Sequence, residues 1–133
     1  MAEREPHASE EEFKKQVVHY PDVPLTELIT GSKSHLVVGE RILVSFLTMA
    51  ANSYFPPHRH EAEQVMIVLH GYVDEIIEGK LYSAKKGDVL ILPSNIEHGG
   101  YIGDVDCQVI DIFSPPRQDY LQKFSKTIGK IGK

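Results

Sequence analysis

Residues 25–113 consist of short apolar segments that are separated by turn-forming residues, and this pattern restricts the fold more than any other feature. Glycines at 31, 39, 71, 79 and 87 and prolines at 56, 57 and 93 interrupt the segments. Many short strands with frequent turns indicate an antiparallel sandwich or barrel rather than alternating helices and strands. The strands that we expect are 25–29, 35–38, 42–49, 65–69, 72–77, 81–82, 89–92, 96–102 and 105–113.

Both ends of the chain carry helical signals. Ser9 and Glu12 have the spacing of a capping box, which predicts a short helix over 10–17 with Phe13 and Val17 as its buried face. Apolar residues at helical spacing near the other end predict a helix over the barrel: Tyr120, Leu121, Phe124 and Ile128. We therefore expect an extension with a short helix (1–20), a barrel (21–116) and a terminal helix with a tail (117–133).

The composition fits one domain with a full hydrophobic core, since the chain has 133 residues and 41% are hydrophobic. The net charge of -5 argues against binding to nucleic acid or to an anionic membrane surface. Cys107 is the single cysteine, so an intrachain disulfide is excluded. The segment 1–6 lacks the apolar core of a signal peptide, and no apolar run is long enough to cross a membrane. We expect a cytoplasmic protein.

Three histidines and one glutamine form a candidate metal site. Positions 58, 60 and 64 are all even-numbered, so the side chains of His58, His60 and Gln64 point the same way if they lie on one strand. His98 follows a predicted strand and enters the same cavity from a neighbouring strand or loop. Three neutral imidazoles and an amide oxygen are a plausible ligand set for one divalent transition metal, with open positions for water or substrate.

Glu61 and Glu63 are the alternative fourth ligands. Both point away from the cavity on a regular strand, and they would enter it only if the loop contained a bulge. Gln64 is the preferred ligand for this reason.

Two segments in the expected order resemble the cupin motifs. Residues 51–71 resemble the first motif, which has a histidine, one residue, a histidine, then an acid or amide, six residues and a glycine. The second motif is matched by Gly87, Pro93, Asn95 and His98, where Asn95 replaces a glycine and both residue types can adopt positive φ. The resemblance covers about 36–113 and implies an all-β cupin double-stranded β-helix, a jelly-roll barrel.

Most metal-binding cupins resemble one another in having a glutamate at this position. This chain has Gln64 there instead. A carboxylate suits iron in oxygenases, whereas an amide leaves the site more positive. The departure favours Lewis-acid chemistry on an anionic ligand over activation of oxygen. The identity of the metal stays open among Ni, Zn, Fe, Mn and Co.

Asp111 interrupts the apolar face of the last predicted strand. A buried carboxylate is costly unless it is paired or hydrogen-bonded, so two interpretations compete. In one, Asp111 pairs with Arg117 or caps a loop and is structural. In the other, Asp111 faces the metal cavity as a general acid or base, and Arg117 clamps a substrate carboxylate.

The string 111–117, together with the motif His-x-His-x-x-x-Gln, resembles the KdgF-type pectin-degradation cupins. That resemblance implies an enzyme that opens the ring of unsaturated uronates to the linear keto form. Asp111 would move the proton, Phe113 would wall the sugar site, and Arg117 would hold the carboxylate. Glu61-Ala62-Glu63 departs from the usual Pro-His-Glu of that family.

Two other functions remain open at this point, an iron-dependent cupin dioxygenase and a non-catalytic module that binds a metal or a small ligand. Small cupins that resemble this chain are commonly homodimers, and the β-prone region 36–44 is a candidate contact because exposed strand edges invite pairing. The partners that we expect are therefore a small anionic substrate and a second copy of the chain.

Overall fold

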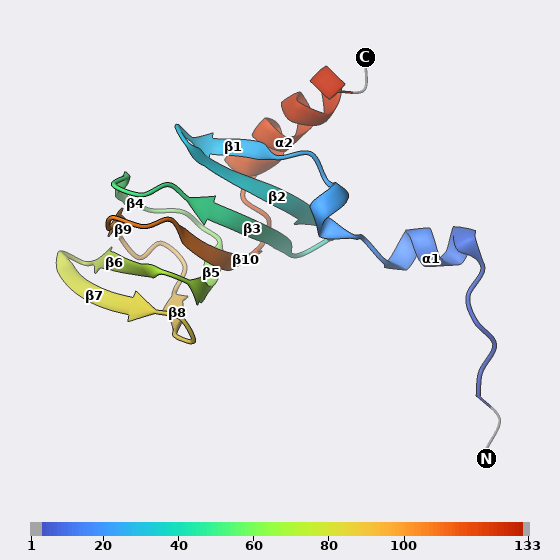
Figure 1. Ribbon diagram of the computed structural model, residues 1–133, viewed down its shortest axis with the longest axis horizontal. Coiled ribbons are helices and arrows are strands. Elements are labelled where there is room, and N and C mark those ends of the chain that lie inside the picture. Colours follow the sequence, from blue (N-terminus) through green and yellow to red (C-terminus); the bar gives the residue numbers. More distant parts are fainter. Residues whose placement is uncertain (1–3, 132–133) are drawn as a thin grey trace.

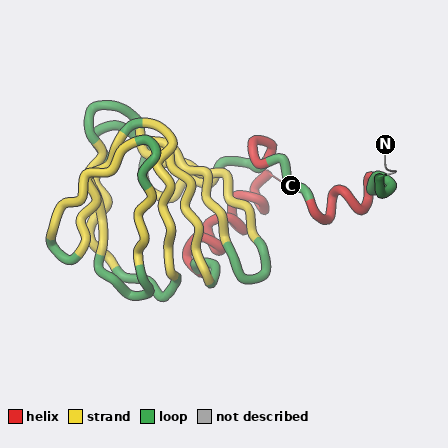
Figure 2. Tube along the Cα trace, turned by 90° about the horizontal axis from the view of Figure 1, so that it is seen from below, coloured by secondary structure: helices red, strands yellow, loops and turns green. Residues whose placement is uncertain are grey.

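The computed structural model describes residues 4–131, which contain two packed antiparallel β-sheets with a helix at each end of the chain (Figure 1). The tube view shows the strands in two layers with the helices to one side of them (Figure 2). The strands are β1 Thr26–Ile29, β2 Ser32–Val38, β3 Leu43–Met49, β4 Tyr54–His58, β5 Glu63–His70, β6 Tyr72–Ile77, β7 Lys80–Lys85, β8 Val89–Leu92, β9 His98–Ile102 and β10 Cys107–Ser114. The predicted all-β fold is confirmed.

The six-stranded sheet has the order β1-β2-β3-β10-β5-β8, and the four-stranded sheet has the order β4-β9-β6-β7. β10, which follows all the other strands in the sequence, is inserted between β3 and β5. Alternate residues of the central strands are fully buried between the sheets, as period-two patterning requires. The core is mainly aliphatic and includes Leu36, Leu43, Val68, Val73, Val109 and Phe113.

β4 is a strand that the sequence did not predict, because Pro56 and Pro57 indicated an interruption. β4 tolerates the prolines because it is an edge strand of the four-stranded sheet and pairs only with β9. The pairing is close: a Cβ atom on Gly99 would lie 2.8 Å from the carbonyl carbon of Pro56. β4 therefore ends at His58, which lies opposite His98 on β9.

The N-terminal helix α1, Glu10–Gln16, begins at the predicted capping box between Ser9 and Glu12. The expectation of a buried face was wrong, because no residue of α1 is buried and Phe13 is 54% exposed. The helix extends away from the sandwich on an arm, as Figure 1 shows. The 3₁₀ helix η1, Tyr20–Asp22, ends the arm, and the ring of Tyr20 stacks on Phe46 with ring centroids 3.8 Å apart.

The C-terminal helix α2, Gln118–Ile131, packs against the sandwich beside β1, as predicted. Tyr120 and Phe124 contact the hydrophobic core, and Lys123 donates from Nζ to the carbonyl oxygen of Leu28 at 2.6 Å. The helix continues to Ile131, and the rest of the predicted tail lies outside the described residues. Within residues 4–131, neither helix is long and apolar enough to cross a membrane.

Candidate metal centre

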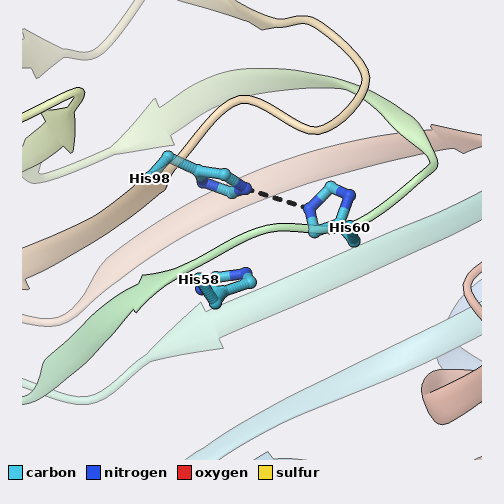
Figure 3. Close-up of side chains that lie close together, drawn as sticks. All are labelled: His58, His60 and His98. Atoms are coloured by element: carbon cyan, nitrogen blue, oxygen red, sulfur yellow. Dashed lines mark hydrogen bonds between the residues drawn. The ribbon is translucent and has the colours of Figure 1, made fainter.

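His58, His60 and His98 meet at one end of the sandwich, and Figure 3 shows their rings turned towards one another. One ring nitrogen from each residue lies within 4.8 Å of those of the other two. The Nε2 atoms of His60 and His98 are 2.9 Å apart. Two ligands at about 2.1 Å from one ion and at right angles are themselves about 3 Å apart, so this spacing suits a metal.

The chain between His58 and Gln64 is not a continuous strand. β4 ends at His58, residues 59–62 form a loop, and β5 begins one residue before Gln64. The predicted parity on one strand was therefore wrong, although all three side chains still face inward. The backbone N–H of Asn95 donates to the carbonyl oxygen of His60 at 2.8 Å, which fixes the loop against the segment before His98. Asn95 has φ of 62°, the positive value that its motif position predicted.

Hydrogen bonds on the outer nitrogens orient the imidazoles. The Nδ1 of His58 lies 3.0 Å from the carbonyl oxygen of Pro56, and the Nδ1 of His60 lies 2.8 Å from that of Ala62. A carbonyl oxygen can only accept, so each Nδ1 carries the proton and each Nε2 presents a lone pair to the centre. The Nε2 of His58 is buried and has no hydrogen-bond partner within residues 4–131.

Gln64 adds a further acceptor to this cluster. Its Nε2 donates to Oδ1 of Asp111 at 2.9 Å, which turns its Oε1 towards His60 Nε2 at 3.2 Å. Acceptor atoms therefore outnumber donors at the centre, and a cation is the species that satisfies such a set. The donor set fits a divalent metal, with His58, His60, Gln64 and His98 as its candidate ligands.

Burial keeps the histidines neutral. It lowers the pKa of His60 and of His98 to about 4, and the Arg117 guanidinium acts in the same direction on both. Burial also lowers the pKa of His58. Neutral imidazole is the form that binds a metal, so the rings are ready as ligands at neutral pH.

Glu75 is a candidate site residue that the sequence analysis missed. Its Oε2 lies 3.1 Å from Nδ1 of His98, and its side chain is buried on β6. Burial raises the pKa of Glu75 to about 8. The available signal was the alternation of Val73, Glu75 and Ile77, which places an acid on an otherwise apolar face in the same way as Asp111.

Asp111 lies beside Gln64 on the inner face of β10, and it lines the same cavity as His58 and His98. Burial raises its pKa to about 7, although the hydrogen bond from Gln64 acts in the opposite direction. The pair with Arg117, one of the two interpretations of Asp111, does not form in the described residues. The orientation of Asp111 matches the alternative interpretation, in which the carboxyl group faces the cavity.

Arg117 binds an internal carboxylate. Its Nη2 and Nε atoms donate to the two oxygens of Asp119 at 2.7 and 3.1 Å, and its guanidinium lies 3.9 Å from the centroid of the Tyr120 ring. This is the bidentate geometry that was predicted for a substrate carboxylate. Phe113, the predicted wall of the sugar site, is fully buried, and its ring contacts those of His60 and Tyr120 edge-on.

The cavity next to the histidines is small, with a volume of about 40 Å³. Arg117 is part of its wall and of the walls of two outer hollows, of about 310 and 300 Å³. Asp119 also lines both outer hollows. The two hollows beside the Arg117–Asp119 pair therefore reach the size of a typical ligand pocket, about 300–1,000 Å³, whereas the cavity next to the histidines does not.

The family model of the cupin domain matches residues 45–113 of this chain. The matched range includes all four candidate metal ligands and ends at Phe113. The chain is a cupin. The match does not extend to Arg117, Asp119 or the arm.

The cupin is similar to two proteins called KdgF. It is 28% identical over 102 residues to the pectin degradation protein KdgF of Dickeya dadantii. The matched residues cover 75% of this chain and 93% of that protein. The structure of KdgF from a Halomonas species has a TM-score of 0.67 and 26% identity, with 72% of this chain and 89% of that chain covered. An RmlC-like cupin from Shewanella frigidimarina shares the fold, with a TM-score of 0.70, 20% identity, and coverage of 78% and 96%.

Proposed function

We propose that this cupin is a metal-dependent enzyme that acts on a small sugar acid, such as an unsaturated uronate, by isomerisation, tautomerisation or a lyase-type proton transfer. The observation that carries the proposal is the convergence of acceptor atoms from His58, His60, Gln64 and His98 beside the buried carboxyl group of Asp111. The similarity to the KdgF proteins supports the choice of substrate class.

The four candidate ligands would hold one divalent ion, and when bound it would polarise a carbonyl or hydroxyl oxygen of the substrate as a Lewis acid. Gln64 keeps its amide oxygen towards the centre because Asp111 accepts its N–H. Glu75 holds the ring of His98 in place through Nδ1. The identity of the metal stays open.

Asp111 is the residue that we propose to move the proton. Tautomerisation of an enol takes a proton from an oxygen and delivers one to a carbon, so a single group that serves both transfers must accept a proton and donate one. A carboxyl group whose pKa is raised to about 7 can do both near neutral pH.

Arg117 is the proposed partner of the substrate carboxylate, and Asp119 occupies it in this structure. The two carboxylates compete for one guanidinium. A substrate that displaces Asp119 would enter from the outer hollows, and Phe113 would support the site from beneath His60 rather than contact the sugar.

The variant Asp111→Asn tests this function. We expect turnover of an unsaturated uronate to fall by 10²-fold or more, the usual contribution of a general acid–base group, while the metal content per chain stays unchanged. Turnover is followed by the loss of ultraviolet absorbance of the conjugated double bond, and metal by elemental analysis. Unchanged turnover in the loaded variant would remove Asp111 from the mechanism.

A non-catalytic module that binds metal or a small ligand is the second candidate. The small inner cavity and the occupied Arg117 favour it. Tight binding of an unsaturated uronate without any product by NMR would support this role over the enzyme. Oxygen uptake linked to loss of substrate would instead favour the dioxygenase.

A cytoplasmic location stays a prediction.

A further inference from the structure

The two hollows beside the Arg117–Asp119 pair differ in charge. The first, of about 310 Å³, has two cations and two acids in its lining, which balance: Arg59, Arg117, Glu61 and Asp119. The second, the α2 hollow, has about 300 Å³ and lies between β1, β4 and α2. Its charged residues are Arg117, Lys123 and Asp119, so one positive charge is in excess. A bound carboxylate would bring this hollow to balance, whereas it would make the first hollow negative.

The α2 hollow also borders the candidate metal centre. Arg117 and His58 line it, and both line the small inner cavity as well, so the two spaces share a wall. The rings of Phe55 and Tyr120 add apolar surface to the hollow. An apolar wall with a cationic rim suits a small sugar acid, which has an apolar ring face and a carboxylate.

Lys123 is the cation of the α2 hollow that has no acid as its partner within residues 4–131. Its Nζ donates to the carbonyl oxygen of Leu28 on β1 at 2.6 Å. An ammonium group has three N–H donors, so Lys123 can keep this hydrogen bond and still donate to a carboxylate.

Asp119 is the carboxylate nearest to Lys123 along α2. The two residues are four positions apart, the spacing at which side chains of a helix are neighbours, and the acid precedes the base, which is the favourable order. Burial raises the pKa of the Asp119 carboxyl group, but Arg117, the backbone N–H of Tyr120 and Lys123 together hold this pKa below its usual range. Lys123 therefore already acts on Asp119 without a direct ion pair.

We propose that Lys123 receives Asp119 when the carboxylate of a substrate takes its place on Arg117. This inference rests on the proposed binding of a sugar acid by Arg117. Arg117 keeps its position on the Tyr120 ring, 3.9 Å from the centroid, and its two donors pass to the substrate. Without Lys123, the displaced Asp119 would be an unpaired negative charge beside the incoming carboxylate. Lys123 is thus a positioning residue that acts through Asp119.

Titration calorimetry of the full chain with galacturonate tests this role. We expect Lys123→Gln to weaken binding about two- to fivefold, the range that a partly exposed ion pair supplies, and Lys123→Arg to bind as the wild type does. Arg59→Gln is the matched control, because it removes the same charge from the first hollow and should leave the affinity unchanged. Equal weakening in Arg59→Gln and Lys123→Gln would overturn the proposal.

The variant Asp119→Asn separates an indirect role of Lys123 from a direct one. With no carboxylate left to receive, adding Lys123→Gln to Asp119→Asn should change the affinity by less than about twofold. The same loss with and without Asp119 would mean that Lys123 binds the sugar itself, and this result would also overturn the proposal.

The pKa of Asp119 tests the exchange without any sugar. Arg117→Met removes the first partner of Asp119, as an incoming ligand would, and circular dichroism verifies that the chain folds. By carbon NMR, we expect the Asp119 pKa to be lower in Arg117→Met than in Arg117→Met with Lys123→Gln, by about 0.4–0.7. Equal pKa values in the two chains would disprove the role of Lys123. A wild-type chain that binds no galacturonate would instead count against the proposed function, and the two pKa values would still decide the role of Lys123.

Discussion

Each candidate ligand owes its orientation to a residue that is not a ligand. The partners of His58 and His60 are backbone carbonyls two residues away, so local sequence is enough to orient these rings. His98 depends instead on Glu75, which is 23 residues away in the sequence. The site therefore has two long-range supports, Glu75 behind His98 and Asp111 behind Gln64, and removing Glu75 tests whether the geometry is built for a metal.

The change Glu75→Gln should weaken binding of a divalent metal by about 10–100-fold, the usual effect of losing a carboxylate behind a histidine ligand. The amide can still accept from Nδ1 of His98, but it cannot ionise when the metal binds, and an ionised carboxylate would make the imidazole a stronger donor to the ion. Isothermal titration with zinc or nickel measures the affinity.

Glu63→Gln is the matched control for this experiment. Glu63 is an exposed acid beside Gln64, and its side chain points away from the cavity, so the affinity should not change. Weaker binding in Glu63→Gln would contradict the position of Gln64 as the fourth candidate ligand.

At the scale of elements, the start of α2 places Asp119 on Arg117, which forms part of the wall of the cavity next to the histidines. The Arg117 side chain is only 11% exposed while that of Asp119 is 55% exposed, so the carboxylate is the member that a ligand can replace. Burial raises the pKa of the Asp119 carboxyl group, but the Arg117 guanidinium outweighs burial and holds this pKa below its usual range. The pair is therefore charged at neutral pH.

The variant Asp119→Asn should increase the affinity for a saturated uronate by up to about fivefold, since a partly exposed ion pair contributes at most about 1 kcal/mol. Arg117 then no longer has to exchange one carboxylate for another. Titration calorimetry with galacturonate measures the change. Glu97→Gln, which breaks a surface pair with Arg59, serves as the control and should leave affinity unaltered. Equal affinity in Asp119→Asn would mean that Arg117 does not bind the substrate.

The sequence predicts those elements and residues that depend on local patterning. Alternation of apolar residues predicted the positions of most of the strands. Motif spacing predicted that His58, His60 and Gln64 lie near His98. β4 was missed because local propensity opposes a strand at two prolines and only its edge position permits it.

Partners made by the fold were not visible in the sequence. The ion pair of Arg117 with Asp119 depends on where α2 begins. The bond of Glu75 to His98 depends on β6 pairing with β9, which the sequence pattern does not specify. The sequence therefore locates the candidate ligands more readily than it locates the residues that support or compete with them.

At the scale of the whole molecule, the buried titrating groups make stability depend on pH. Histidines with lowered pKa values stabilise the fold fully above about pH 6.5, and this contribution is lost as the pH falls through their folded pKa of about 4. Glu75 and Asp111 have raised pKa values, so their contribution is present at low pH and is lost as the pH rises through about 7 to 8. The two effects oppose one another below pH 6.5.

The metal-free protein should therefore be most stable near pH 6.5 and lose about 2 kcal/mol by pH 8. A bound divalent ion would favour the ionised carboxylates and should reduce this loss. Urea unfolding at several pH values, with a chelator and with added zinc, measures both effects. Stability that rises from pH 6.5 to 8 without metal would contradict the burial of Glu75 and Asp111.

The position of β10 between β3 and β5 has a consequence for biosynthesis. During translation β3 and β5 leave the ribosome long before the strand that joins them, so both expose unpaired edges until residue 114 has emerged. Unpaired edges on an incomplete sheet favour aggregation. We therefore expect the nascent chain to depend on chaperones, and the sheet to close only after β10 has emerged.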